Sequence, residues 1–154
     1  MSLEMRIALG SDEKTVLTDY LVEELRRRGL EVELFGPLRG EPVQWAEVAR
    51  QVAEAVASGR ADQGILCCWT GTGVSIAANK VPGVRAALCH DAETARGARA
   101  WNQANVLCLS LRSTAPAVAR EILDAWFSTG PDPSEAENVA RVEEMDRLYR
   151  GARA

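Results

Sequence analysis

The sequence is poor in the residue types on which several classes of protein depend. It holds one histidine, His90, among 154 residues, so a single chain cannot build a metal centre from several histidines. Its four cysteines include no pair spaced as C-x-x-C, which argues against a structural zinc site and against a disulfide scaffold. The expected chemistry uses no cofactor and no metal, unless carboxylates alone recruit a metal ion.

Positive charge and long apolar runs are also scarce. The 18 basic residues are outnumbered by 22 acidic ones, which gives a net charge of -4. Proteins that bind nucleic acids or anionic membranes present basic surfaces, so neither partner is expected. Apolar runs such as residues 64–69 are far shorter than the roughly 20 residues that cross a bilayer. The N-terminus does not resemble a signal peptide, and we expect a cytoplasmic protein.

What is present is the patterning of a folded α/β protein. A hydrophobic fraction of 47% with 26% charged residues is typical of globular proteins, and the length fits one domain, expected over residues 4–154. Runs typical of buried strands occupy residues 5–10, 30–35, 63–68, 85–89 and 105–109. Helical patterns occupy residues 14–28, 44–58, 74–80, 91–100, 116–127 and 134–150, with a loop at 36–40. This alternation predicts a Rossmann-like three-layer α/β/α sandwich with a five-stranded parallel sheet.

Open parallel sheets bind ligands at the carboxyl ends of their strands, near the point where the strand order reverses. The segment after the third expected strand reads Cys68-Trp69-Thr70-Gly71-Thr72-Gly73. Its glycines allow a sharp turn in which successive N–H groups converge on an anion, and a cysteine there would be favoured as a thiolate. Cys67 should point to the opposite face of the strand. The same segment is also compatible with a plain glycine turn beside two core cysteines.

Four other residues each fit two roles; Asp12, His90 and Arg112 stand at or near strand ends, and Arg141 stands on the last expected helix. Asp12 could bind a sugar hydroxyl or cap the following helix. Arg112 could hold a phosphate or remain a solvated charge, and Arg141 could hold a phosphate or form a salt bridge on the surface. His90 could act as a general base or simply lie exposed in a loop.

The chain resembles the family of type B ribose-5-phosphate isomerases and galactose-6-phosphate isomerases over residues 5–147. The resemblance is densest in residues 52–89, through VAEAVASGRADQGIL and TGTGVSIAANKVPGVRAALC, and continues in NQANVL. It implies metal-free aldose–ketose isomerisation of a sugar phosphate on a Rossmann-like fold. It also implies a homodimer or homotetramer with active sites at the dimer interface, in which the C-terminal helix takes part.

The resemblance assigns roles within the glycine segment by position. Cys68 matches the catalytic base that moves a proton between C1 and C2, and Thr70 matches the residue that assists there. The N–H groups of Gly71, Thr72 and Gly73 match the loop that stabilises the enediolate intermediate. A thiolate beside an anion-stabilising loop suits proton abstraction next to a carbonyl.

The resemblance also assigns substrate contacts outside that segment. Asp12 and Asn102 match ligands of sugar hydroxyls. Arg112 and Arg141 match phosphate-binding arginines that reach in from the second subunit. Trp45 stands at an aromatic position before the second helix.

Several positions depart from the family pattern. Glu13 and Trp101 each replace a histidine, Trp69 replaces a glycine, and Glu137-Asn138 replaces an Arg-His pair. In the family, the histidine that Trp101 replaces is assigned to opening the sugar ring. The changes at Glu13 and Glu137-Asn138 affect phosphate binding, and Trp69 affects the size of the pocket. Glu13 and Glu137 put negative charge where a phosphate is expected, which is unfavourable.

These departures favour a short, open-chain substrate. A tetrose 4-phosphate cannot close a furanose ring because its O4 carries the phosphate, and Trp69 and Trp101 would shorten the pocket. The sequence therefore predicts isomerisation of a tetrose 4-phosphate or a pentose 5-phosphate. The alternatives are a protein that binds a sugar derivative without catalysis and, less favoured by the incomplete glycine pattern, a nucleotide-binding module.

Overall fold

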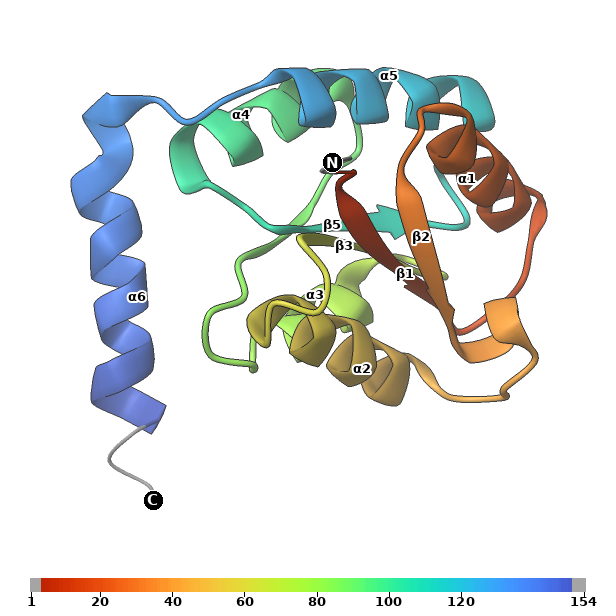
Figure 1. Cartoon of the computed structure of the whole chain (residues 1–154), viewed down its shortest axis with the longest axis horizontal. Helices are drawn as coiled ribbons and strands as arrows, with labels where there is room; N and C mark the ends of the chain where they lie inside the picture. The colour runs from red at the N-terminus through yellow and green to blue at the C-terminus, as the bar shows by residue number, and fades with distance from the viewer. Residues whose placement is uncertain (1–3, 151–154) are drawn as a thin grey trace.

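The computed structural model describes residues 4–150 and is built on a sheet of five parallel strands (Figure 1). The strands are β1 (Arg6–Ser11), β2 (Glu31–Phe35), β3 (Gln63–Cys68), β4 (Ala86–Leu88) and β5 (Val106–Ser110). Their order across the sheet is β2-β1-β3-β5-β4, and every neighbouring pair is parallel. The predicted five-stranded parallel sheet is confirmed. Residues 151–154 of the expected domain lie outside the described residues.

Helices cover both faces of this sheet (Figure 1). They are α1 (Val16–Arg27), α2 (Trp45–Ala57), α3 (Thr72–Ala78), α4 (Ala92–Asn102), α5 (Pro116–Ser128) and α6 (Ala136–Arg150). Helices α1, α4 and α5 pack on one face and α2 and α3 on the other, so the predicted three-layer sandwich is confirmed. Helix α6 stands at one end of the molecule and contacts α4. Within residues 4–150, no helix combines the length and apolarity needed to cross a membrane.

Alternation along β3 divides its side chains between two separate cores. Ile65 and Cys67 pack under α1, α4 and α5, whereas Leu66 and Cys68 pack under α2 and α3. This is the period of two that a strand imposes on its side chains. The expectation that the two adjacent cysteines face opposite layers is therefore confirmed.

Some segment boundaries differ from the expected ones. The segment expected as a loop at 36–40 forms a 3-10 helix, η1 (Gly36–Arg39). A second 3-10 turn, η2 (Pro133–Glu135), precedes α6, and the carboxylate of Asp132 accepts the N–H of Ser134 at 2.9 Å. Asp132 therefore caps this segment.

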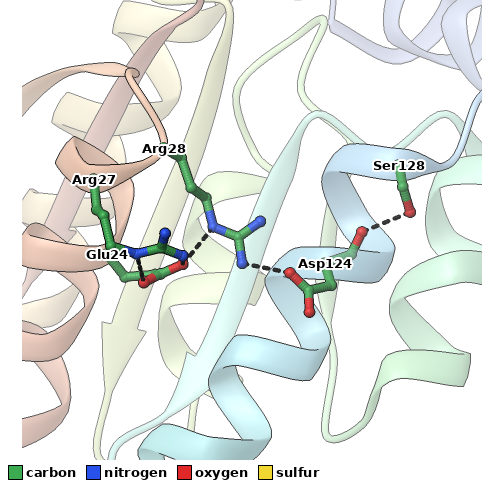
Figure 2. Close-up of polar contacts among 5 residues, drawn as sticks. All are labelled: Glu24, Arg27, Arg28, Asp124 and Ser128. Atoms are coloured by element: carbon green, nitrogen blue, oxygen red, sulfur yellow. Dashed lines mark hydrogen bonds and ion pairs between the residues drawn. The ribbon is translucent and has the colours of Figure 1, made fainter.

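A buried carboxylate joins α1 to α5 (Figure 2). Glu24 accepts hydrogen bonds from Arg27 Nε at 2.8 Å and from Arg28 Nε at 2.8 Å. Arg28 also donates to Asp124 Oδ1 on α5 at 2.6 Å. The hydrogen bonds from Arg27, followed by those from Arg28, lower the pKa of Glu24 to about 2 even though burial opposes ionisation. The ionised form of Glu24 is therefore the form that stabilises this contact.

We expect the Glu24 network to make stability depend on acid pH. Because the folded pKa of about 2 lies below the unfolded value of 4.5, the stabilisation is complete above pH 4.5 and is lost as the pH falls through 2. Glu24→Gln should lower the free energy of unfolding at pH 7 by roughly 1–3 kcal/mol, since it removes the charged acceptor of Arg27 and leaves Arg28 only its bond to Asp124. Urea denaturation of both proteins between pH 7 and 2 measures this, with exposed Glu23→Gln as the control. An unchanged acid dependence in Glu24→Gln would contradict the assignment.

Candidate active site

A cavity of about 310 Å³ opens where β1 and β3 end. It is lined by Asp12, Trp45, Cys68, Trp69, Thr70, Thr72 and Gly73. β1 and β3 are neighbours, and the chain continues from β1 to β2 on one side and from β3 toward β4 and β5 on the other. The cavity thus lies at the reversal of strand order, where parallel sheets bind their ligands.

The segment that leaves β3 is held in place by the segment that leaves β5. The N–H of Leu111 donates to the carbonyl oxygen of Cys68 at 2.9 Å, and the N–H of Arg112 donates to that of Trp69 at 3.0 Å. The hydroxyl of buried Ser110 also donates to the Trp69 carbonyl at 2.9 Å. The cavity wall at Cys68 and Trp69 is therefore fixed by backbone contacts that join two strands.

The two glycines of the turn are each required by a close approach. Gly71 caps α3 with a left-handed φ of 80°, and a Cβ there would lie 2.6 Å from Leu88 Cδ1 and 3.0 Å from the Leu109 carbonyl carbon. A Cβ on Gly73 would lie 2.8 Å from the ring of Trp45. Helix α3 consequently begins at Thr72, two residues earlier than expected.

Trp45 is a wall of the cavity that the expected set of site residues omits. Its indole lies against Gly73 and is 44% exposed, and Trp69 is 58% exposed in the same cavity. One feature of the sequence points to this role of Trp45: it is an aromatic residue at the loop where the second helix begins. Its contact with Gly73 joins residues 28 positions apart, which local patterns do not indicate.

Cys68 differs from the other three cysteines in its surroundings. Burial raises the pKa of Cys89 to about 12 and raises the pKa values of Cys67 and Cys108 well above the ordinary range. These three thiols stay protonated at neutral pH and pack in the cores. Cys68 is 5% exposed and is the cysteine that lines the cavity.

Asp12 brings a carboxylate with spare hydrogen-bonding capacity to the cavity. Its Oδ1 is buried and has no hydrogen-bond partner among the residues that the structure describes. Burial, followed by the neighbouring Glu13 carboxylate, raises the pKa of Asp12. Helix α1 is capped by Thr15, which forms a capping box with Thr18, so Asp12 is not the helix cap. A buried carboxylate oxygen without a donor suits a ligand hydroxyl.

The remaining predicted site residues with side chains do not line the cavity. Glu13 and the side chain of Arg112 are exposed and are not among the residues that line the cavity. Trp101 and Asn102 line a different groove of about 460 Å³, formed by the end of α4, the start of β4, and α6. Arg141 is exposed on α6. A single chain therefore does not bring Trp101, Asn102 or Arg141 to the cavity.

The cavity lining contains no histidine. His90 follows β4, is exposed, and is not one of the lining residues. In the part of the chain spanning residues 4–150, no three His, Cys, Asp or Glu side chains gather in a way that could hold a metal ion. The groups at the cavity are a thiol, a carboxylate, two hydroxyls and two indoles.

Comparison with known proteins identifies the family. A model described as Ribose/Galactose Isomerase matches residues 7–145. D-erythrulose-4-phosphate isomerase from Pectobacterium atrosepticum is 36% identical over 154 residues, covering 93% of this chain and 98% of that protein. Ribose-5-phosphate isomerase B from Escherichia coli is 38% identical over 144 residues, covering 90% and 97%. The structure of ribose-5-phosphate isomerase B from Clostridium thermocellum has a TM-score of 0.88 and 40% identity, covering 94% of this chain and 99% of that one. The chain therefore belongs to the ribose/galactose isomerase family of sugar-phosphate isomerases, which are intramolecular oxidoreductases.

Proposed function

We propose that this chain interconverts the aldose and ketose forms of a small sugar phosphate, with Cys68 as the base. The observation that carries the proposal is the cavity at the ends of β1 and β3, which Cys68 and Asp12 line together. A thiolate can take the proton from a carbon next to a carbonyl when the resulting negative charge on oxygen is stabilised. The matched roles of Cys68 and the glycine turn in the family agree with this chemistry.

In the proposed mechanism, the Cys68 thiolate takes the proton from C2 of the open-chain aldose. The N–H groups of Gly71, Thr72 and Gly73 stabilise the enediolate oxygen. Asp12 Oδ1, which has no hydrogen-bond partner among the described residues, accepts a sugar hydroxyl. Cys68 then returns the proton to C1, which yields the ketose. Thr70 assists the accompanying proton movement between O1 and O2.

Of the two candidate substrates, we favour the tetrose 4-phosphate over the pentose 5-phosphate. Trp45 and Trp69 are bulky walls, and the lining has no histidine that could open a sugar ring. A tetrose 4-phosphate needs no ring opening because its O4 is esterified. One relative, from Pectobacterium atrosepticum, is itself named D-erythrulose-4-phosphate isomerase.

We further propose that a second copy of the chain completes the site. Trp101, Asn102 and Arg141 lie away from Cys68 in their own chain, and a homodimer or homotetramer would bring the partner's copies to it. Helix α6 presents exposed apolar side chains suited to such a contact, namely Val142, Met145, Leu148 and Tyr149. Arg112 and Arg141, which have no ion-pair partner among the described residues, would hold the phosphate.

Proton NMR in deuterated water tests the proposed activity. The protein is incubated separately with erythrose 4-phosphate and with ribose 5-phosphate. We expect ketose formation with deuterium incorporation from erythrose 4-phosphate, at a rate at least about tenfold above that from ribose 5-phosphate. Efficient conversion of ribose 5-phosphate alone would overturn the tetrose preference. Saturable binding of a sugar phosphate without any proton exchange would show that the protein binds the sugar but does not isomerise it, and would overturn the isomerase proposal.

A further inference from the structure

Two threonine hydroxyls form a hydrogen-bonded pair in the wall of the cavity. Thr70 Oγ1 and Thr72 Oγ1 are 2.7 Å apart, and either oxygen can be the donor. Both residues line the cavity together with Cys68. The left-handed turn at Gly71 separates the two residues in the chain. A Cβ at Gly71 would lie only 2.6 Å from Leu88 Cδ1 and 3.0 Å from the Leu109 carbonyl carbon, so the turn that carries the two threonines is closely packed.

We propose that Thr70 and Thr72 act together as a two-hydroxyl relay that carries a proton from O2 to O1 of the substrate. The inference rests on the proposed isomerase function and adds the Thr72 side chain to it. The resemblance gives the side-chain role to Thr70 and uses Thr72 only through its backbone N–H. In the relay, Thr72 contributes twice to the reaction: its backbone N–H stabilises the enediolate oxygen, and its hydroxyl transfers a proton.

Aldose–ketose isomerisation moves two protons, and the relay accounts for the second one. Cys68 takes the proton from C2, the C–H electron pair becomes the C1=C2 bond, and the carbonyl pair moves to O1. One threonine hydroxyl then gives its proton to O1, takes the proton of its partner hydroxyl, and the partner takes the proton of O2. The electron pair left on O2 forms the new carbonyl while the C1=C2 pair takes the proton back from Cys68. The thiolate and both hydroxyls are regenerated without a further reactant.

The geometry of the pair suits this transfer. Each hydroxyl has one donor and two acceptor sites, so a bonded pair keeps one proton and several lone pairs free for the substrate. A separation of 2.7 Å is ordinary for an O–H···O bond, and reversing its direction requires only rotation of the two hydroxyls. The oxygens on C1 and C2 of a cis-enediol are themselves close neighbours. Two paired hydroxyls can therefore contact both oxygens at once, one accepting from O2 while the other donates to O1.

Two variants of matched size separate the hydroxyl of Thr72 from the rest of its side chain. Thr72→Val keeps the shape and the backbone N–H but removes the oxygen, and Thr72→Ser keeps the oxygen but removes the methyl group. We expect Thr72→Val to lower kcat about tenfold with little change in KM, whereas Thr72→Ser stays within about threefold of the unchanged protein. Thermal unfolding of both variants establishes that they are folded.

The decisive measurement is the ratio of deuterium-labelled aldose to ketose formed from erythrose 4-phosphate in deuterated water. Without the relay, Cys68 still exchanges the C2 proton, but the enediolate returns to the aldose more often. The ratio should therefore rise about tenfold in Thr72→Val and not in Thr72→Ser. An unchanged ratio in Thr72→Val, or an equal change in both variants, refutes the relay while leaving the isomerase intact. Absence of exchange in the unchanged protein overturns the isomerase proposal and the relay with it.

Discussion

Cys68→Ala is expected to lower the isomerisation rate by about 10²–10⁴-fold, because a general base of this kind contributes rate factors of that size. The loss should appear in kcat and in the exchange of the C2 proton alike, since both require the thiolate. Steady-state kinetics and deuterium exchange with erythrose 4-phosphate measure it. We expect a small effect on folding, because Cys68 is a small side chain that packs with the α2 and α3 layer where that layer borders the cavity.

Cys67→Ala is the matched control for the loss of Cys68. It removes the same atom from the neighbouring residue, but Cys67 is completely buried in the opposite layer against α1, α4 and α5. We expect activity close to that of the unchanged protein and a loss of about 1 kcal/mol in stability from the small cavity created. Retained activity in Cys68→Ala would remove that residue as the base, and equal losses in both variants would point to packing as the cause.

Gly71→Ala is expected to lower the free energy of unfolding by roughly 2–4 kcal/mol. A left-handed φ costs a residue with a Cβ about 1 kcal/mol, and crowding adds about 1–3 kcal/mol. The added methyl group would lie 2.6 Å from the Leu88 side chain and 3.1 Å from the Leu109 carbonyl oxygen. The backbone of β5 cannot yield easily, so the turn itself should shift and carry Thr70 and Thr72 with it. Urea denaturation and kcat measure the two consequences.

Gly59→Ala separates the two contributions to that cost. Gly59 has a φ of 82°, close to the 80° of Gly71, but a Cβ there would meet no atom within 4 Å. We therefore expect a loss of about 1 kcal/mol and unchanged activity, because Gly59 lies in the turn before β3 and away from the cavity. If Gly71→Ala proved no more destabilising than Gly59→Ala, the close packing of the turn against β5 would contribute nothing to the cost of the Gly71→Ala substitution.

Agreement between the sequence and the structure is greatest where a side-chain pattern is local. The expected third strand coincides with Gln63–Cys68, and its unbroken apolar character matches complete burial between two layers. Helix ends shift by one to two residues where a cap decides them. At α1 the capping box of Thr15 and Thr18 starts the helix later than the pattern suggests, and at α3 the left-handed Gly71 starts it earlier.

The candidate site was accessible from the sequence only in part. The segment from Cys68 to Gly73 and Asp12 stand at strand ends, and parallel sheets gather such ends at one edge. Trp101 and Asn102 entered the expected site through the resemblance, and the structure puts them in a separate groove of the same chain. No local pattern indicates that Trp45 lies against Gly73, because this contact depends on how α2 packs beside α3.

The sequence by itself determined the element types, the alternation that puts Cys67 and Cys68 on opposite faces, and the residues able to carry proton chemistry. These follow from periods of two and 3.6 residues and from side-chain composition, which are local properties. Only the tertiary structure decided the strand order, the wall formed by Trp45, the pairing of the Thr70 and Thr72 hydroxyls, and the link from Glu24 through Arg28 to Asp124. Each of these depends on distances set by packing or by the precise turn of the backbone, and such distances are not encoded in the period of any one segment.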